Sequence, residues 1–399
     1  MRLVPMLVLC LVAACTRGPA PLTLAVGLLP GELAPYRAVI ADFERETGER
    51  VVVVPQQYAD IRRALAAESA AERGTLDLVE LDVYSLAPAA NDVRVLDEAA
   101  LGDVLEALEP ATVRAGTIDG LRFLPHRVSW QALLYDHARL GAPPATWDEL
   151  LAVARAHPGK IGFKASRYEG LTCDVLPFVW SAGGDGTSFD DAGARAAFAL
   201  FEQLAPYVNP QSATFKEATI VEAMARGELV LHLNWPFAIS VLADQGLAPE
   251  PIRAAPLPAG PQGRATVLGG GYLALARNTA RPDAALRLAR YLLSREVQER
   301  LGRELGWFSA RRDVPPGEGS PLLAGFAAMR GALRSRPERP DYPALSRAWQ
   351  EAFRAVVFDG VAPDAALAAA RERTRAARTP APAAAAAARR ADALGSGDA

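Results

Sequence analysis

Acidic, amide and aromatic side chains recur just after the segments that the sequence predicts to be strands. These candidate residues are Glu32, Gln57, Tyr58, Asp82, Tyr84 and Trp235. Because ligands bind outside the carboxyl ends of strands in open α/β sheets, we expect these side chains to line a crevice. Carboxylates and amides that bond hydroxyl groups, placed beside flat rings, are suited to a hydroxyl-rich ligand such as a sugar.

Each candidate also has a purely structural interpretation. Glu32 could cap the helix that follows it, and Asp82 could be a solvated loop acid. Trp235 and Tyr84 could be ordinary core residues. An acid at a strand end that faces a crevice is nevertheless typical of a binding site, so we favour binding roles for Asp82 and Trp235.

Three consecutive glycines at 269–271 precede a predicted strand. They match neither GxxxxGK nor GxGxxG, and they do not join a strand to a helix, which argues against a phosphate-binding loop. Close approach of the backbone to a ligand, or a flexible crossing between two parts of the fold, explains them better.

An alternation of strands and helices positions the candidates. Strands are predicted at 22–28, 51–54 and 77–83, separated by a helix that ends at Gly48 and by a second helix over 59–72. This order predicts a parallel sheet with right-handed crossovers, that is, a doubly wound α/β domain. Later elements are predicted as strands at 160–165, 228–234 and 272–276, and as helices starting at the Thr146–Glu149 capping box and at 192–204, 219–226, 236–245, 282–304, 342–358 and 363–377.

The composition excludes several classes of function. The 399 residues include 43 basic and 46 acidic side chains, and this net charge of −3 lacks the basic excess that nucleic-acid binding uses. Half of the residues are hydrophobic, as in a globular protein of two or three domains. Because 4 His and 3 Cys show no metal-binding spacing, we predict no metal and no cofactor.

The N-terminus resembles an export signal. Residues 1–14 contain one Arg and an apolar run too short to span a bilayer. The run ends in Val-Ala-Ala-Cys, which resembles the bacterial lipobox, so we predict a lipid anchor at Cys15, a linker over 15–21 and attachment to the bacterial cell envelope. Ordinary signal cleavage is the alternative. Cys173 is expected in the core, and the Ala/Pro-rich tail 378–399 is expected to be flexible.

Several short motifs occur in the order found in one protein family. The most specific is Pro-Pro-Ala-Thr-Trp-Asp-Glu-Leu at 143–150, which is similar to the family's "PPxTWDEL". Weaker similarities lie at 77–82 with 95–97 ("DVVxxD … GxLxxL"), at 124–136 ("P … LYYN", with Asp136 in place of Asn), at 223–227 ("AMxxG") and at 268–275 ("GGxxL"). Together they resemble the extracellular solute-binding proteins (family 1) of carbohydrate ABC importers, from about residue 22 to residue 377.

The resemblance implies a two-lobed, periplasmic-binding-protein-like fold of type II, in which each lobe is a doubly wound mixed sheet. The chain would cross the hinge near 125–127, 260–264 and Pro315. Lobe 1 would combine residues 22–126 with 265–315, and lobe 2 would combine 127–264 with 316–377.

The resemblance also implies which residues touch the ligand. It carries over to Glu32, Asp82, Trp235, Gly271, Tyr272 and, more loosely, Arg336. Tyr84 stands where relatives often have Trp. The strand-end residues Gln57 and Tyr58 complete the predicted ligand-binding set.

The function implied is that of a non-enzymatic, monomeric receptor. It would capture a mono- or oligosaccharide between its lobes and deliver it to an ABC permease. A polyamine or another small polar solute is an alternative ligand, a secreted carbohydrate-active enzyme is an alternative function, and the receptor could instead serve a sensor.

Overall fold

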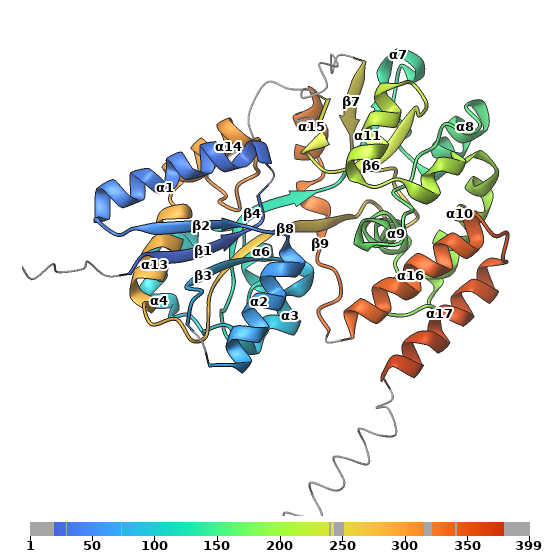
Figure 1. Ribbon diagram of the computed structural model, residues 1–399. Helices are drawn as coiled ribbons and strands as arrows, with labels where there is room; N and C mark the ends of the chain where they lie inside the picture. The colour runs from blue at the N-terminus through green and yellow to red at the C-terminus, as the bar shows by residue number, and fades with distance from the viewer. Residues whose placement is uncertain are drawn as a thin grey trace, which may run out of the picture.

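The computed structural model describes residues 20–28, 30–72, 74–238, 241–242, 251–314, 321–339 and 341–378, which form two lobes (Figure 1). The predicted signal, Cys15, nearly all of the tail, the crossing at Pro315 and part of the helix predicted at 236–245 lie outside the described residues.

Lobe 1 is built around a six-stranded sheet. Its strands are β1 (Leu22–Val26), β2 (Val51–Pro55), β3 (Leu78–Asp82), β4 (Leu124–Trp130), β8 (Thr266–Leu275) and β9 (Leu333–Arg334). The order is β2-β1-β3-β8-β4, with β9 beside β8. β1 pairs in parallel with β2 and β3, which confirms the parallel arrangement predicted from the alternation. β8 runs antiparallel to β3 and β4, so the sheet is mixed.

Helices cover both faces of this sheet, as a doubly wound fold requires. Alternate residues of β1 point to opposite faces, so Leu24 packs with α1 and Ala25 packs with α2. α1 ends at Gly48, which adopts the left-handed conformation expected of a helix stop (φ 72°). The helices of lobe 1 are α1 (Leu33–Thr47), α2 (Tyr58–Ala70), α3 (Leu86–Ala89), α4 (Glu98–Leu101), α5 (Asp103–Ala107), α6 (Pro110–Ala115), α13 (Pro282–Leu292) and α14 (Arg295–Leu305), with 3-10 turns η1 (Pro30–Glu32), η2 (Val83–Ser85) and η3 (Ala90–Asp92).

Lobe 2 contains a smaller sheet in the order β6-β5-β7, formed by β5 (Ala132–Asp136), β6 (Leu231–Asn234) and β7 (Ile252–Ala255). β5 is antiparallel to both neighbours, and the segment around Ile161 contributes only isolated parallel bridges, to Val208 and Leu231. The strand predicted at 160–165 is therefore wrong. Only the Gly162 N–H reaches β6, at the Leu231 carbonyl, whereas the next two N–H groups bond to side chains: Phe163 to Ser212 and Lys164 to Asp174.

The helices of lobe 2 surround a long buried helix. They are α7 (His137–Leu140), α8 (Trp147–Ala156), α9 (Glu169–Ser181), α10 (Ala192–Leu204), α11 (Glu217–Ala225), α15 (Pro321–Ala327), α16 (Tyr342–Val357) and α17 (Pro363–Arg378), with η4 (Ala205–Tyr207), η5 (Pro210–Thr214) and η6 (Arg330–Ala332). The predicted cap of α8 is present, because the Thr146 hydroxyl accepts a hydrogen bond from the Glu149 N–H at 3.3 Å. The Glu149 carboxylate accepts its bond from the N–H of Ala145 instead.

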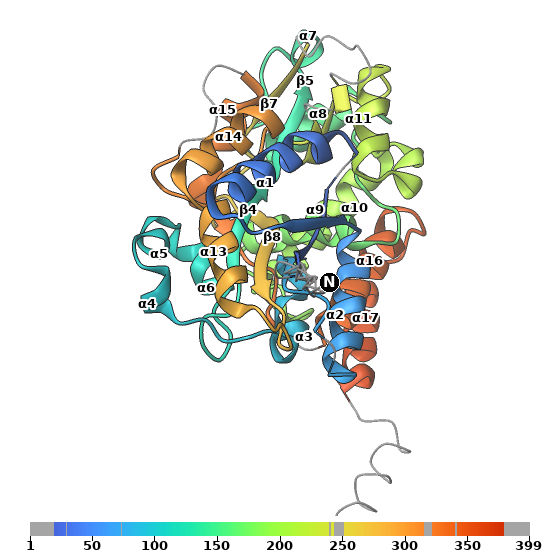
Figure 2. The same ribbon diagram turned by 60° about the vertical axis from the view of Figure 1, so that its left-hand side comes forward.

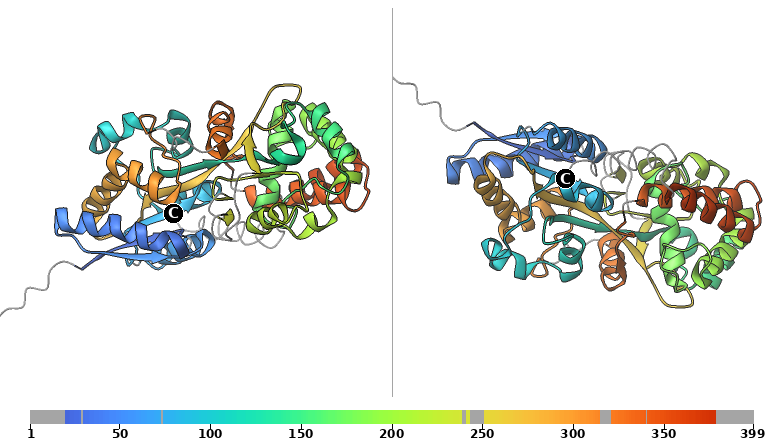
Figure 3. Two further views of the ribbon diagram at one scale, coloured as in Figure 1. Left: turned by 90° about the horizontal axis from the view of Figure 1, so that it is seen from above. Right: turned by 90° about the horizontal axis from the view of Figure 1, so that it is seen from below.

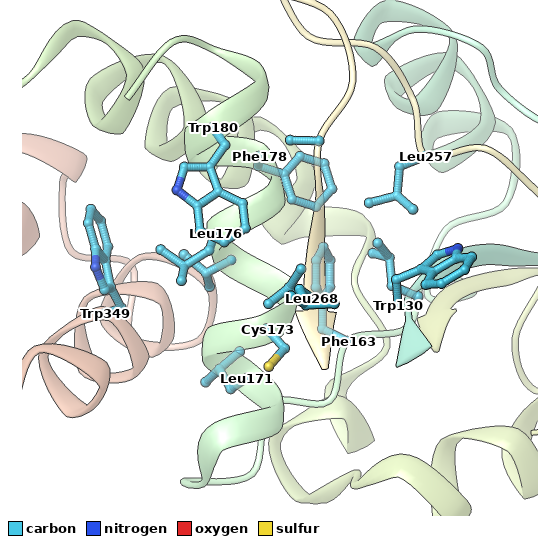
Figure 4. Packing of buried hydrophobic residues seen from close by; sticks show 14 of the residues in the cluster. Trp130, Phe163, Leu171, Cys173, Leu176, Phe178, Trp180, Leu257, Leu268 and Trp349 are labelled. Atoms are coloured by element: carbon cyan, nitrogen blue, oxygen red, sulfur yellow. The ribbon is translucent and has the colours of Figure 1, made fainter. Parts of the chain in front are cut away.

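α9 is the centre of the lobe 2 core (Figure 4). Cys173 and Leu176 on this helix are buried, with Trp349 of α16 on one side and Trp130 of β4 on the other. Cys173 is thus a core residue, as expected. Burial raises the pKa of its thiol well above the usual value, so the thiol stays neutral.

Among the described residues, the lobes are joined by the β4–β5 connection, by residues 256–265, by the α15–β9 connection and by the segment that leads from β9 to α16 (Figures 2 and 3). β4 continues through the crossing predicted at 125–127 and pairs with β8 as far as Trp130. The lobe boundaries expected from the sequence remain a prediction. Among the described helices, none combines the length and the apolar character that crossing a membrane would need.

Candidate functional site

Glu80 organises the carboxyl edge of β1, β2 and β3. Its side chain is fully buried, and its carboxylate accepts hydrogen bonds from the Gly27 N–H at 3.1 Å and the Tyr58 hydroxyl at 3.2 Å. It also contacts His126 Nδ1 at 2.8 Å and Arg127 Nε at 3.3 Å. Burial acts against the charge of Glu80, but Arg127, His126 and Gly27 together hold its pKa below the usual range.

Arg127 connects Glu80 to the predicted residues Glu32 and Tyr58. Its guanidinium donates to the Tyr58 hydroxyl at 2.6 Å and lies 3.7 Å from Glu32. The same group stacks 4.1 Å above the ring of Trp307, whose Nε1 donates to Glu32 at 2.6 Å. These five residues come from five separate parts of lobe 1 and form a mixed acidic, cationic and aromatic cluster, the Arg127 cluster.

A second cluster surrounds Asp82, at the end of β3. Arg336 donates to Asp82 Oδ1 at 3.0 Å and to Glu169 at 2.8 Å, and its guanidinium lies 5.0 Å from the centre of the Tyr84 ring. Tyr84 faces Tyr342 across the lobes at 6.5 Å between ring centres. Burial raises the pKa of Asp82, Arg336 offsets part of this effect, and Glu169 adds to it.

The two clusters are neighbours because Glu80 and Asp82 lie two residues apart on β3. Residues two apart on a strand share one face, so both carboxylates project to the same side of the sheet. Each is paired with an arginine from another chain segment, Arg127 from β4 and Arg336 from the β9–α16 connection.

The glycine run allows close packing at this place. A Cβ at Gly271 would lie 2.1 Å from Glu80 Oε1, and a Cβ at Gly269 would lie 2.7 Å from the ring of Trp235. Trp235, which follows β6, is therefore in contact with β8. Its half-buried ring lies where the two sheets approach each other.

Three other predicted site residues, Gln57, Tyr272 and Arg336, are placed less favourably for contact with a ligand. Gln57 is exposed at the start of α2, and its side chain makes no capping bond. Tyr272 is fully buried and its hydroxyl donates to the Thr112 carbonyl at 3.1 Å, which favours a structural role in lobe 1 over ligand contact. The side chain of Arg336 is only 4% exposed and is occupied by two carboxylates, which favours a role other than direct ligand contact.

The predicted site did not include Glu80, Arg127, Trp307, Glu169 or Tyr342. Glu169 begins α9 and Arg127 lies on β4, and neither element was predicted from the sequence. Neither residue carries a local signal, since each joins the site only through tertiary contacts. Within the described ranges, no group of three or more His, Cys, Asp or Glu side chains is arranged to hold a metal ion.

Comparisons with known proteins agree with this architecture. The family described as "Bacterial extracellular solute-binding protein" matches residues 38–324. A probable ABC transporter-binding protein of Deinococcus radiodurans is 29% identical over 287 residues, which cover 64% of this chain and 68% of that protein.

Solved structures resemble the whole fold. The maltose-bound MalE3 of T. maritima has a TM-score of 0.77 at 24% identity, over 89% of this chain and 99% of that one. A solute-binding protein of Thermotoga lettingae bound to α-D-tagatose has a TM-score of 0.78 at 23% identity, with the same coverage. A cyclo/maltodextrin-binding protein with maltotetraose has a TM-score of 0.77 at 21% identity, over 91% and 99%. The chain therefore belongs to the bacterial extracellular solute-binding protein family, whose members are exported binding proteins and not enzymes.

Proposed function

We propose that this protein is the receptor of an ABC importer, and that it captures a mono- or oligosaccharide between its two lobes and delivers it to the permease. The observation that carries the proposal is that carboxylates and aromatic rings of both lobes meet at the end of β3. Asp82 and Tyr84 come from lobe 1, and Glu169 and Tyr342 from lobe 2. Carboxylates accept bonds from sugar hydroxyls, and rings cover the apolar face of a sugar.

The ligands of structural relatives support the same class of ligand. The proteins compared above were solved with maltose, tagatose and maltotetraose. In this chain, Glu32, Tyr58, Asp82, Tyr84 and Trp235 are the proposed ligand-binding residues from the predicted set, and the Gly271 backbone allows close approach to β8. Gln57, which is exposed at the start of α2, remains a proposed ligand-binding residue.

Binding would be coupled to closure of the lobes. A ligand that touches both lobes only in the closed state shifts the population toward that state, by a hinge motion in the connecting segments. We further propose that the receptor is a monomer. A lipid on Cys15, a residue outside the described ranges, would hold it at the cell envelope.

A thermal-shift screen with maltose, maltotetraose, tagatose and spermidine tests the function. If the dissociation constant is micromolar, a thousandfold excess of sugar stabilises the protein by about 4 kcal/mol and raises Tm by several degrees. We expect Trp235→Ala to raise the dissociation constant of the responding sugar about tenfold or more, because a buried ring contact is lost.

The matched control is Trp147→Ala, which truncates another half-buried tryptophan of the same lobe at the start of α8. It should leave the dissociation constant unchanged. Stabilisation by spermidine with no response to any sugar would contradict the carbohydrate class, and hydrolysis of maltotetraose with turnover would contradict the receptor function.

A further inference from the structure

Arg336 occupies one of the segments that connect the lobes. It follows β9, which belongs to the lobe 1 sheet, and precedes α16, which packs in lobe 2. Its side chain is 4% exposed, although loops usually lie at the surface. A charged side chain buried in a connection needs partners that compensate for the loss of water.

Those partners come from different lobes. Nη2 donates to Oδ1 of Asp82, at the end of β3 in lobe 1, and Nη1 donates to Oε1 of Glu169, the first residue of α9 in lobe 2. The planar guanidinium can hold two carboxylates at once, which the single ammonium of a lysine cannot do with the same geometry. We call these three residues the Asp82–Arg336–Glu169 bridge.

The bridge is anchored firmly on the lobe 2 side. Glu169 also accepts hydrogen bonds from the Tyr342 hydroxyl and, at 2.7 Å, from the Ser346 hydroxyl. Both of its oxygens are therefore occupied. On the lobe 1 side, Oδ1 of Asp82 also accepts from the Tyr84 N–H at 3.3 Å, whereas Oδ2 accepts no hydrogen bond from any residue in the described ranges.

We propose that Arg336 is a positioning residue: it fixes Asp82 so that Oδ2 remains available to a ligand hydroxyl, and it stabilises the closed arrangement of the lobes before any ligand binds. The role of Asp82 as a ligand contact rests on the proposed function, but the interlobe bridge does not. Without Arg336, Asp82 and Glu169 would face each other as unpaired like charges, and this repulsion would favour an open arrangement.

An exposed ion pair between the lobes serves as the control for the buried bridge. Arg330, just after α15, lies 3.7 Å from Glu109 at the start of α6, and these side chains are 29% and 31% exposed. Exposed pairs are screened by water and contribute little. Arg330→Met therefore removes the same type of residue from the same interface without disturbing a buried bridge.

Small-angle X-ray scattering of the ligand-free protein tests the bridge directly. We expect Arg336→Met to increase the radius of gyration, Arg336→Lys to give a smaller increase, and Arg330→Met to match the wild type. Glu169→Gln is a milder variant, because it keeps the shape and the hydroxyl donors while removing the lobe 2 charge, and it should also increase the radius. An unchanged radius in folded Arg336→Met and Glu169→Gln, or an equal increase in Arg330→Met, would overturn the proposal.

Calorimetric titration with maltose tests the effect on binding. Because closed molecules would become rarer, we expect Arg336→Met to raise the dissociation constant about tenfold or more, with partial rescue in Arg336→Lys. Unchanged affinity in Arg336→Met would contradict the positioning role. If the wild type binds none of maltose, maltotetraose or tagatose, the proposed function fails instead, and the scattering experiment still decides the bridge.

Discussion

Buried charges in this protein are paired with groups of opposite charge on other elements or segments of the chain. Glu80 is paired with His126 and Arg127, and Lys164 is paired with Asp174; Glu80, Lys164 and Asp174 are fully buried. Moving a charge out of water costs several kcal/mol, so a buried ion is tolerated only with close partners and further hydrogen bonds. Lys164 meets this requirement by also donating to the Leu233 carbonyl at 2.8 Å.

We predict that Lys164→Met lowers the free energy of unfolding by about 3–5 kcal/mol, because Asp174 is then left buried without its cation. Urea denaturation followed by circular dichroism measures this loss. The double variant Lys164→Met/Asp174→Leu should recover much of it, because no unpaired charge remains. If the double variant is as unstable as the single variant, the cost arises from packing and not from the unpaired carboxylate.

At the scale of elements, the glycine run of β8 lets three parts of the fold meet. Gly271 faces the Glu80 carboxylate, and Gly269 faces the Trp235 ring. Gly270 adopts φ 136°, a conformation that other residues rarely take, and its Cα lies against the backbone of β4. The run therefore serves close packing between β8, β3 and the segment after β6.

We predict that Gly271→Ala lowers the free energy of unfolding by about 1–3 kcal/mol, since the added methyl group would overlap a carboxylate that three groups hold in place. Gly331→Ala is the control, because a Cβ there would meet nothing within 4 Å. Chemical denaturation of both variants provides the measurement. Equal stability of the two variants would show that Glu80 can move aside.

At the scale of the whole molecule, the paired strands β4 and β8 lie between the two lobes (Figure 1). The lobes are also joined by the Asp82–Arg336–Glu169 bridge. This architecture suits a receptor whose lobes move relative to each other. Such a receptor must also remain close to its permease, which is the proposed purpose of the lipid on Cys15.

We predict that Cys15→Ser moves the protein from the membrane fraction to the soluble fraction of producing bacteria, because acylation requires that thiol. Immunoblotting of the separated fractions measures the shift. Cys173→Ser removes a buried core thiol and should leave the protein in the membrane fraction. Retention of Cys15→Ser in the membrane fraction would contradict lipid anchoring.

Local patterns predicted the first half of lobe 1 well. The alternation through β1, α1, β2, α2 and β3 was predicted because each element has an apolar periodicity and a clear stop, such as Gly48. The four- to six-residue helices between Leu86 and Ala115 were missed, since such short helices have too few turns to show a periodic face. The strand expected at 160–165 did not form because the segment leaves β6 after Gly162, and the N–H groups of Phe163 and Lys164 bond to side chains.

The sequence by itself determined the class of the fold, the order of the main elements and the acid Asp82 at the end of β3, because these depend on short-range periodicity and on residue type. Only the tertiary structure added Glu80 to the site and decided what both acids touch. Arg127, Trp307, Glu169 and Arg336 reach Glu80 or Asp82 and their neighbours from 47 to 275 residues away along the chain. No local pattern encodes such pairings, because they are selected by the need to compensate buried charge once the sheets have come together.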